Sequence, residues 1–210
     1  MQRSRLSYLL TFATFGAFCI CAARADEDVK DALHKAQKAQ TDAPAYRMRM
    51  VSTEANDKTN GMTVDVVQPG SIYWKTENNG RTEVELWSDG KKTYIRQAAD
   101  GAVRESTIEV SSLLTQARQV NPFETLMTEA REPKFVGHEE LNGVGTSVYT
   151  FKSSLMRIDS SVKLWVSDAD HCPLKCEVET HRELKGASVH KKTVVTYEYG
   201  PSIKVVVPTR

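Results

Sequence analysis

The sequence lacks the compact motifs that mark common catalytic sites. Its 210 residues contain no Gly-x-Ser-x-Gly, no His-Glu-x-x-His and no glycine-rich phosphate-binding loop. The acidic residues Glu139, Glu140, Asp159, Asp168 and Asp170 fall in expected turns or at exposed strand positions, where a solvated charge is the ordinary role. We therefore expect a protein that is not an enzyme and that holds no cofactor.

The sequence also lacks a strong net charge and any sign of a boundary between domains. The formal net charge is only +1, and no repeat, low-complexity tract or linker divides the chain. Because a basic field is what holds a polyanion, we expect no nucleic-acid partner. The length beyond the first 25 residues suits one domain with its own hydrophobic core, and we expect a monomer.

Long apolar runs are absent except at the N-terminus. Two arginines precede an apolar run from Leu6 to Ala22, and the small-residue site Ala23 to Ala25 precedes acid at Asp26. This order is typical of a cleaved secretory signal peptide, whereas a spanning helix needs about 20 strongly apolar residues. The sequence thus predicts a signal peptide at 1–25 and one exported, periplasmic domain at 26–210, without lipidation.

Cysteine is scarce, because the exported part holds only Cys172 and Cys176. A disulfide is the default pairing in an oxidising compartment. However, four extended residues span about 13 Å, and a disulfide needs Cα atoms within about 7 Å. Two alternatives stay open: a bend at Pro173 with a disulfide, or a straight strand with two small core side chains.

A metal site is not expected at these cysteines. The spacing of His171, Cys172, Cys176 and His181 matches no common zinc arrangement. In an extended strand, both cysteines also point to the face opposite the two histidines.

What is present is a change of period along the chain. Residues 26–41 carry an apolar stripe with helical spacing, which Ala43-Pro44 ends. From Tyr46, apolar and polar side chains alternate in short runs separated by turns such as Asn60-Gly61 and Asp89-Gly90, which predicts an antiparallel meander. Residues 111–130 interrupt it with two short helices, and strands resume from about residue 134 to 207.

These elements predict an α+β fold. A large antiparallel sheet, strongly twisted, curls, and its concave face needs the N-terminal helix and the short helical insertion as a cover or lid. The apolar side chains expected on that face form our predicted ligand-binding cavity: Met50, Met62, Val64, Trp74 and Leu86 from the sheet, with Phe123 and Leu126 from the insertion. The alternative is that the same side chains form a sealed core.

Several of these segments occur in an order found in a known family. They are the run Val67 to Trp74, the Asp-Gly hairpin within Leu86 to Ile95, Asn121-Pro122-Phe123 followed by Leu126, and the later stretches 164–168, 173–175, 197–200 and 207–208. In order and spacing they resemble the periplasmic lipoprotein carriers of the Lol pathway and their wider superfamily.

The resemblance implies an unclosed β half-barrel with helices as a lid over an apolar cavity. It implies that the protein binds and transports acyl chains of lipids or lipoproteins, with membrane-bound donor and acceptor proteins as partners. In the carriers an Arg before the strand-end Pro bonds the lid helices, and Gln68 takes that place as the lid contact, without the charge. The wider superfamily also leaves a second function open, a periplasmic regulator or scaffold with a filled core that binds a partner protein.

Overall fold

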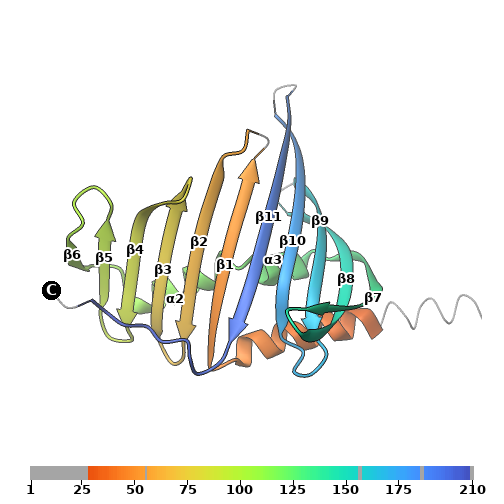
Figure 1. The fold of residues 1–210 in the computed structure, drawn as a ribbon, viewed down its shortest axis with the longest axis horizontal. Coiled ribbons are helices and arrows are strands. Elements are labelled where there is room, and N and C mark those ends of the chain that lie inside the picture. The colour runs from red at the N-terminus through yellow and green to blue at the C-terminus, as the bar shows by residue number, and fades with distance from the viewer. Residues whose placement is uncertain (1–27, 55, 156–157, 185–186, 209–210) are drawn as a thin grey trace, which may run out of the picture.

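The alternation that begins at Tyr46 produces eleven strands in one antiparallel sheet (Figure 1). The computed structural model describes residues 28–208 except 55, 156–157 and 185–186, so the predicted signal peptide lies outside the described residues. The strands are β1 (Ala45–Glu54), β2 (Thr59–Val67), β3 (Ser71–Asn78), β4 (Arg81–Asp89), β5 (Thr93–Gln97), β6 (Val103–Ser106), β7 (Arg131–Leu141), β8 (Val144–Leu155), β9 (Ile158–Ser167), β10 (Pro173–Leu184) and β11 (Ala187–Tyr199).

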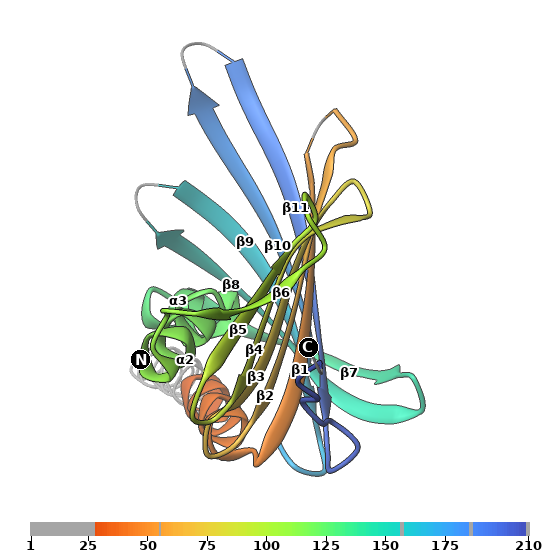
Figure 2. The same ribbon diagram turned by 90° about the vertical axis from the view of Figure 1, so that its left-hand side faces the viewer.

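The sheet consists of two meanders joined by the first and last strands. Its order is β6-β5-β4-β3-β2-β1-β11-β10-β9-β8-β7, and β1 pairs with β11 from Tyr46↔Tyr199 to Glu54↔Lys191. Strands β6 and β7 lie at opposite edges, so the sheet is not closed. The chain between them must cross from one edge to the other, and it does so over the concave face (Figure 2).

Within the part of the chain that the structure describes, three helices cover that concave face. A helix at 28–42 ends before Pro44, and the crossing segment forms α2 (Val110–Gln119) and α3 (Pro122–Thr128). Asn121 caps α3 by accepting a hydrogen bond from the backbone N–H of Phe123, and Pro122 stands at the first helical position, where its missing N–H matters least. The helices expected from the sequence are therefore confirmed, as is the α+β sheet.

One expected strand is wrong. Residues 202–207 form no strand in the structure, since β11 ends at Tyr199 and the chain leaves the sheet at Gly200. The reason is topological. Strand β11 is bordered by β1 on one side and β10 on the other, so a segment that follows it cannot form a hairpin with β11.

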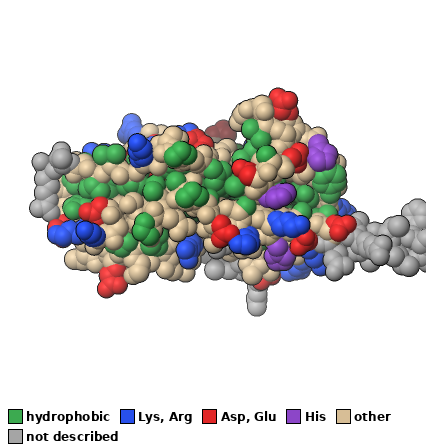
Figure 3. Space-filling model, turned by 90° about the horizontal axis from the view of Figure 1, so that it is seen from below, with side chains coloured by type: hydrophobic (Ala, Val, Ile, Leu, Met, Phe, Trp, Pro, Cys, Tyr) green, Lys and Arg blue, Asp and Glu red, His purple; other side chains and the backbone are tan. Residues whose placement is uncertain are grey.

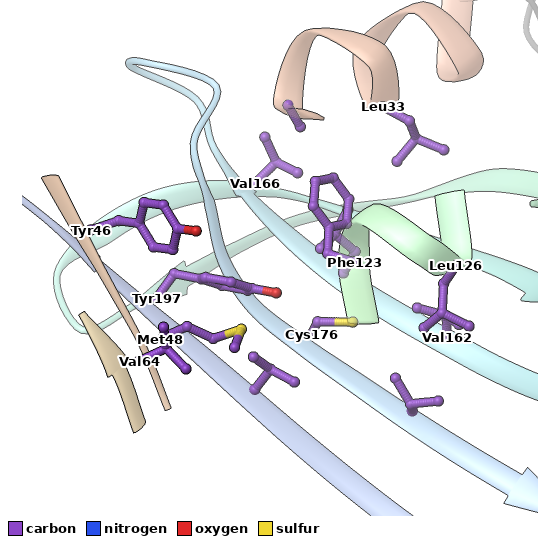
Figure 4. Close-up of a cluster of buried hydrophobic side chains, with 14 of the residues drawn as sticks. Leu33, Tyr46, Met48, Val64, Phe123, Leu126, Val162, Val166, Cys176 and Tyr197 are labelled. Carbon is purple, nitrogen blue, oxygen red and sulfur yellow. The ribbon is translucent and has the colours of Figure 1, made fainter. Parts of the chain in front are cut away.

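The core lies between the concave face and the helices. In Figure 4, Phe123 and Leu126 of α3 lie over Cys176 and Val162 of the sheet, while Leu33 comes from the N-terminal helix. Each buried side chain of this size contributes about 1.5–3 kcal/mol by leaving water. Because the helices are too short to be stable alone, this burial is what holds them to the sheet.

The convex face carries charges that are paired across strands, together with the buried aromatic side chains Trp87 and Trp165. On this face Arg47 of β1 donates two hydrogen bonds, each of 2.6 Å, to the buried carboxylate of Asp65 in β2. At the lower end of the sheet, hydrophobic side chains lie among charges of both signs (Figure 3). The larger hydrophobic cluster thus lies on the concave face under the helices, whereas the convex face combines ion pairs with buried Trp87 and Trp165.

Candidate functional site

The concave face brings together all seven residues that the sequence predicts for an apolar cavity. They form one hydrophobic cluster: Met62, Val64, Phe123 and Leu126 are buried in it, and Met50, Trp74 and Leu86 are partly buried against it. The register explains the sheet part of the cluster, because Met50 lies opposite Met62 and Trp74 lies opposite both Val64 and Leu86.

The centre of this cluster is filled by its own side chains. Val64 and Phe123 are both 0% exposed, and Met62 is 8% exposed. At its centre, the cluster is therefore a sealed core, which was the alternative to a ligand-binding cavity. Contact of these three residues with a ligand stays a prediction, since it requires the helices to move.

An open pocket of about 370 Å³ lies at the margin of the cluster, between α3 and the strands beyond it. Its apolar floor consists of Met50, Val120, Pro122, Leu126, Ile158 and Val178. Of the predicted residues, Met50 and Leu126 line it. Sequence reasoning missed Val120, Ile158 and Val178, although Val178 shares the alternating face of β10 with Cys176.

A buried polar hub fastens the helices to the sheet. Asn121, which is 3% exposed, donates from Nδ2 to Oε1 of Gln40 at 3.0 Å. Its Oδ1 accepts from the hydroxyl of Tyr197 at 2.8 Å and from the backbone N–H of Phe123 at 3.3 Å. Burial raises the pKa of Tyr197 well above its ordinary value, so this hydroxyl remains a proton donor. One side chain therefore links the N-terminal helix, α3 and β11.

Gln68 makes the second polar contact to the helices. At the end of β2, its Nε2 donates to the backbone oxygen of Thr41 at 3.2 Å. Thr41 lies in the last turn of the N-terminal helix, whose carbonyl groups lack intrahelical partners. The expected lid contact thus falls on the N-terminal helix and is a neutral hydrogen bond. Its role in opening the lid stays a prediction.

The disulfide that the sequence left open is not formed, because Cys172 and Cys176 are both free and buried. Strand β10 starts at Pro173 and runs extended past Cys176, with a bulge between Pro173 and Lys175 but no return of the chain. Of the two alternatives, the structure adopts the pair of small core side chains.

We expect the two thiols to be unreactive in the folded protein. Burial raises the pKa of Cys172 to about 11 and that of Cys176 to about 12, and alkylation requires the thiolate. At pH 8, iodoacetamide should label the folded, exported protein slowly, with labelling that accelerates as pH rises toward these values. The urea-unfolded, non-reduced protein should take up two labels by mass. Complete resistance of the unfolded chain would instead mean a disulfide.

The structure groups no metal ligands at the cysteines. Within the described residues, no three His, Cys, Asp or Glu side chains lie close enough together to hold a metal ion. Cys176 is in the core, whereas His181 is exposed and faces His190 across β10 and β11 with 3.3 Å between their Nδ1 atoms. None of the described helices is long and apolar enough to cross a membrane.

This protein is similar to known proteins in its structure, but not in its sequence. No family model matches the sequence, and no curated protein matches it. The structure is similar to lipoprotein LppX of Mycobacterium tuberculosis, with a TM-score of 0.55 and 15% identity, and to LprF of Mycobacterium bovis, with a TM-score of 0.56 and 12% identity. Each likeness covers 88% of this chain and 98% of the other. The expected fold, an unclosed half-barrel with helices on its concave face, is therefore confirmed, and the resemblance seen in the sequence holds at the level of the fold.

Proposed function

We propose that the exported protein is a periplasmic binding protein that sequesters acyl chains of lipids or lipoproteins between its concave sheet face and its helices. The observation that carries this proposal is the pocket of about 370 Å³, whose floor is made of core residues such as Leu126 and Val178. Its volume falls in the range of about 300–1,000 Å³ that is typical of small-molecule sites. An apolar floor without convergent catalytic groups suits binding better than chemistry.

The helices over this floor are suited to act as a lid. Helix α2 has ten residues and α3 has seven, so both depend on packing against the sheet. An acyl chain that enters the pocket replaces helix contacts with its own, and each buried CH₂ contributes about 0.8 kcal/mol. Lifting α3 would extend the pocket from Met50 toward Val64 and Phe123, which would then contact the ligand as the sequence predicts.

The fold supports the same class of function. The likeness to lipoprotein LppX is one of fold, and the sequence motifs that resemble those of the Lol-pathway carriers fit a protein that binds acyl chains. A carrier of this kind exchanges its load with membrane-bound donor and acceptor proteins, which we propose as partners. The sealed centre, with Val64 at 0% exposed, favours one alternative, a regulator or scaffold that binds a partner protein.

Native mass spectrometry of the exported protein tests this proposal. We expect an intact mass that begins at Asp26, together with adducts that dissociate as lipid or fatty-acyl species when the protein is denatured. A protein without adducts that also takes up no hydrophobic dye would contradict ligand binding and leave the partner-binding alternative. A mass that retains residues 1–25, or an added diacylglycerol, would contradict export as a free domain.

A further inference from the structure

The mouth of the 370 Å³ pocket is built from two chemically different sides. The floor described above is apolar, but the strands that extend beyond α3 contribute a row of hydroxyl groups and one ammonium group. These residues are Ser52, Thr193, Thr180, Ser160 and Lys191, from the four adjacent strands β1, β11, β10 and β9. An acyl chain by itself would contact only the apolar side of the pocket. The hydroxyl and ammonium groups on the other side can form hydrogen bonds only with a polar end of the ligand.

We infer that the preferred ligand is an amphiphile with an anionic head group, and that Lys191 and the hydroxyl row hold this head group at the mouth. The inference rests on the proposed function, because it describes the other end of the same ligand. It orients the ligand with its chain under α3 and its head group toward the free ends of the strands.

The hydroxyl groups form two pairs that retain donors. Ser52 Oγ and Thr193 Oγ1 are 2.9 Å apart, and Ser160 Oγ and Thr180 Oγ1 are 3.3 Å apart. Each pair has two O–H donors and uses one of them for its internal hydrogen bond, so one donor per pair remains. Donors left over at the edge of an apolar pocket match the several acceptor oxygens of a carboxylate or phosphate.

Lys191 supplies the charge. It lies on the concave face of β11 and lines the pocket. The next residue, Lys192, points to the convex face, where its Nζ lies 3.3 Å from a carboxylate oxygen of Glu177. Within the described residues, no carboxylate lies within 4.0 Å of the Lys191 ammonium group, and its register partner Glu54 is the nearest acid by position in the sheet. Because no ion pair of Lys191 is formed among the described residues, its ammonium group beside the apolar floor can attract an anionic head group.

Competition between matched amphiphiles tests the inference. Dodecanoate and dodecanol share a chain length but differ in charge at pH 7.5, and each can displace a neutral hydrophobic dye from the protein. We expect dodecanoate to bind up to about fivefold more tightly than dodecanol, as one partly exposed ion pair provides. In Lys191→Met this preference should disappear, while dodecanol affinity stays within about twofold of the original.

The neighbouring lysine provides the control. Lys192→Met removes the same charge from the chain but on the convex face, so it should keep the preference for dodecanoate. Equal affinity of both amphiphiles for the unaltered protein would overturn the inference and leave acyl binding intact. Retention of the preference in Lys191→Met would overturn the role of Lys191. Failure of both amphiphiles to displace the dye would instead count against the proposed function itself.

Discussion

Replacing Met50 with Glu is expected to weaken the binding of a neutral hydrophobic dye at least about tenfold, which corresponds to 1.4 kcal/mol or more. Met50 lies on the concave face of β1, lines the pocket and is only partly buried against the core. A carboxylate at this place would face the apolar ligand, and removing it from water without a partner costs several kcal/mol. A fluorescence titration of N-phenyl-1-naphthylamine measures the change.

The adjacent residue gives a matched control. Val51 points to the convex face and is 49% exposed, so Val51→Glu places the same charge one residue away but outside the pocket. Its dye affinity should stay within about twofold of the original, since exposed substitutions change free energies by about 0.5 kcal/mol. Met50 serves this test better than Val64, because Val64 is 0% exposed and a charge there would unfold the sheet. Equal affinities of Met50→Glu and the unaltered protein would place the ligand elsewhere.

Replacing Asn121 with Ala is expected to lower the free energy of unfolding by about 3 kcal/mol or more. The variant loses the cap of α3, which contributes about 1 kcal/mol. It also leaves the Tyr197 hydroxyl and Gln40 Oε1 without their partner, and a buried polar group left unsatisfied costs about 1–3 kcal/mol. The Nε2 of Gln40 already lacks a hydrogen-bond partner in the folded protein. Urea unfolding followed by circular dichroism gives the change from the midpoint and slope.

The cap position of α2 offers the control for this prediction. Glu109 occupies that position and is exposed, but its side chain accepts no hydrogen bond from the helix backbone; it accepts only a 3.5 Å bond from the Ser111 hydroxyl. Glu109→Ala should therefore change the free energy of unfolding by no more than about 0.5 kcal/mol. If the two variants unfold at the same urea concentration, the hub around Asn121 does not fasten the helices.

The alternation of apolar and polar side chains along the sequence determined most of the strands and the faces of the sheet. A two-residue period together with Asp-Gly and Asn-Gly turns is enough to predict strands, hairpins and the face on which Met50, Val64 and Trp74 lie, because neighbouring strands in a meander are also neighbours along the chain. The same local reasoning predicted two short helices within 111–130, and α2 and α3 lie there. It failed at 202–207, where the pattern was suitable but the preceding strand, β11, is already paired on both sides.

Contacts between distant parts of the chain were decided only by the tertiary structure. The pairing of β1 with β11 sets Ser52 beside Thr193, and the crossing of α2 and α3 sets Asn121 beside Gln40 and Tyr197. Sequence alone does not give such contacts, since a one-residue change in register would send Lys191 to the convex face and Lys192 to the pocket. The sequence therefore determined which side chains are apolar and which faces they share. The curl of the sheet and the path of the helices decided which of them are sealed in the core and which line the pocket, because that depends on what packs above each residue.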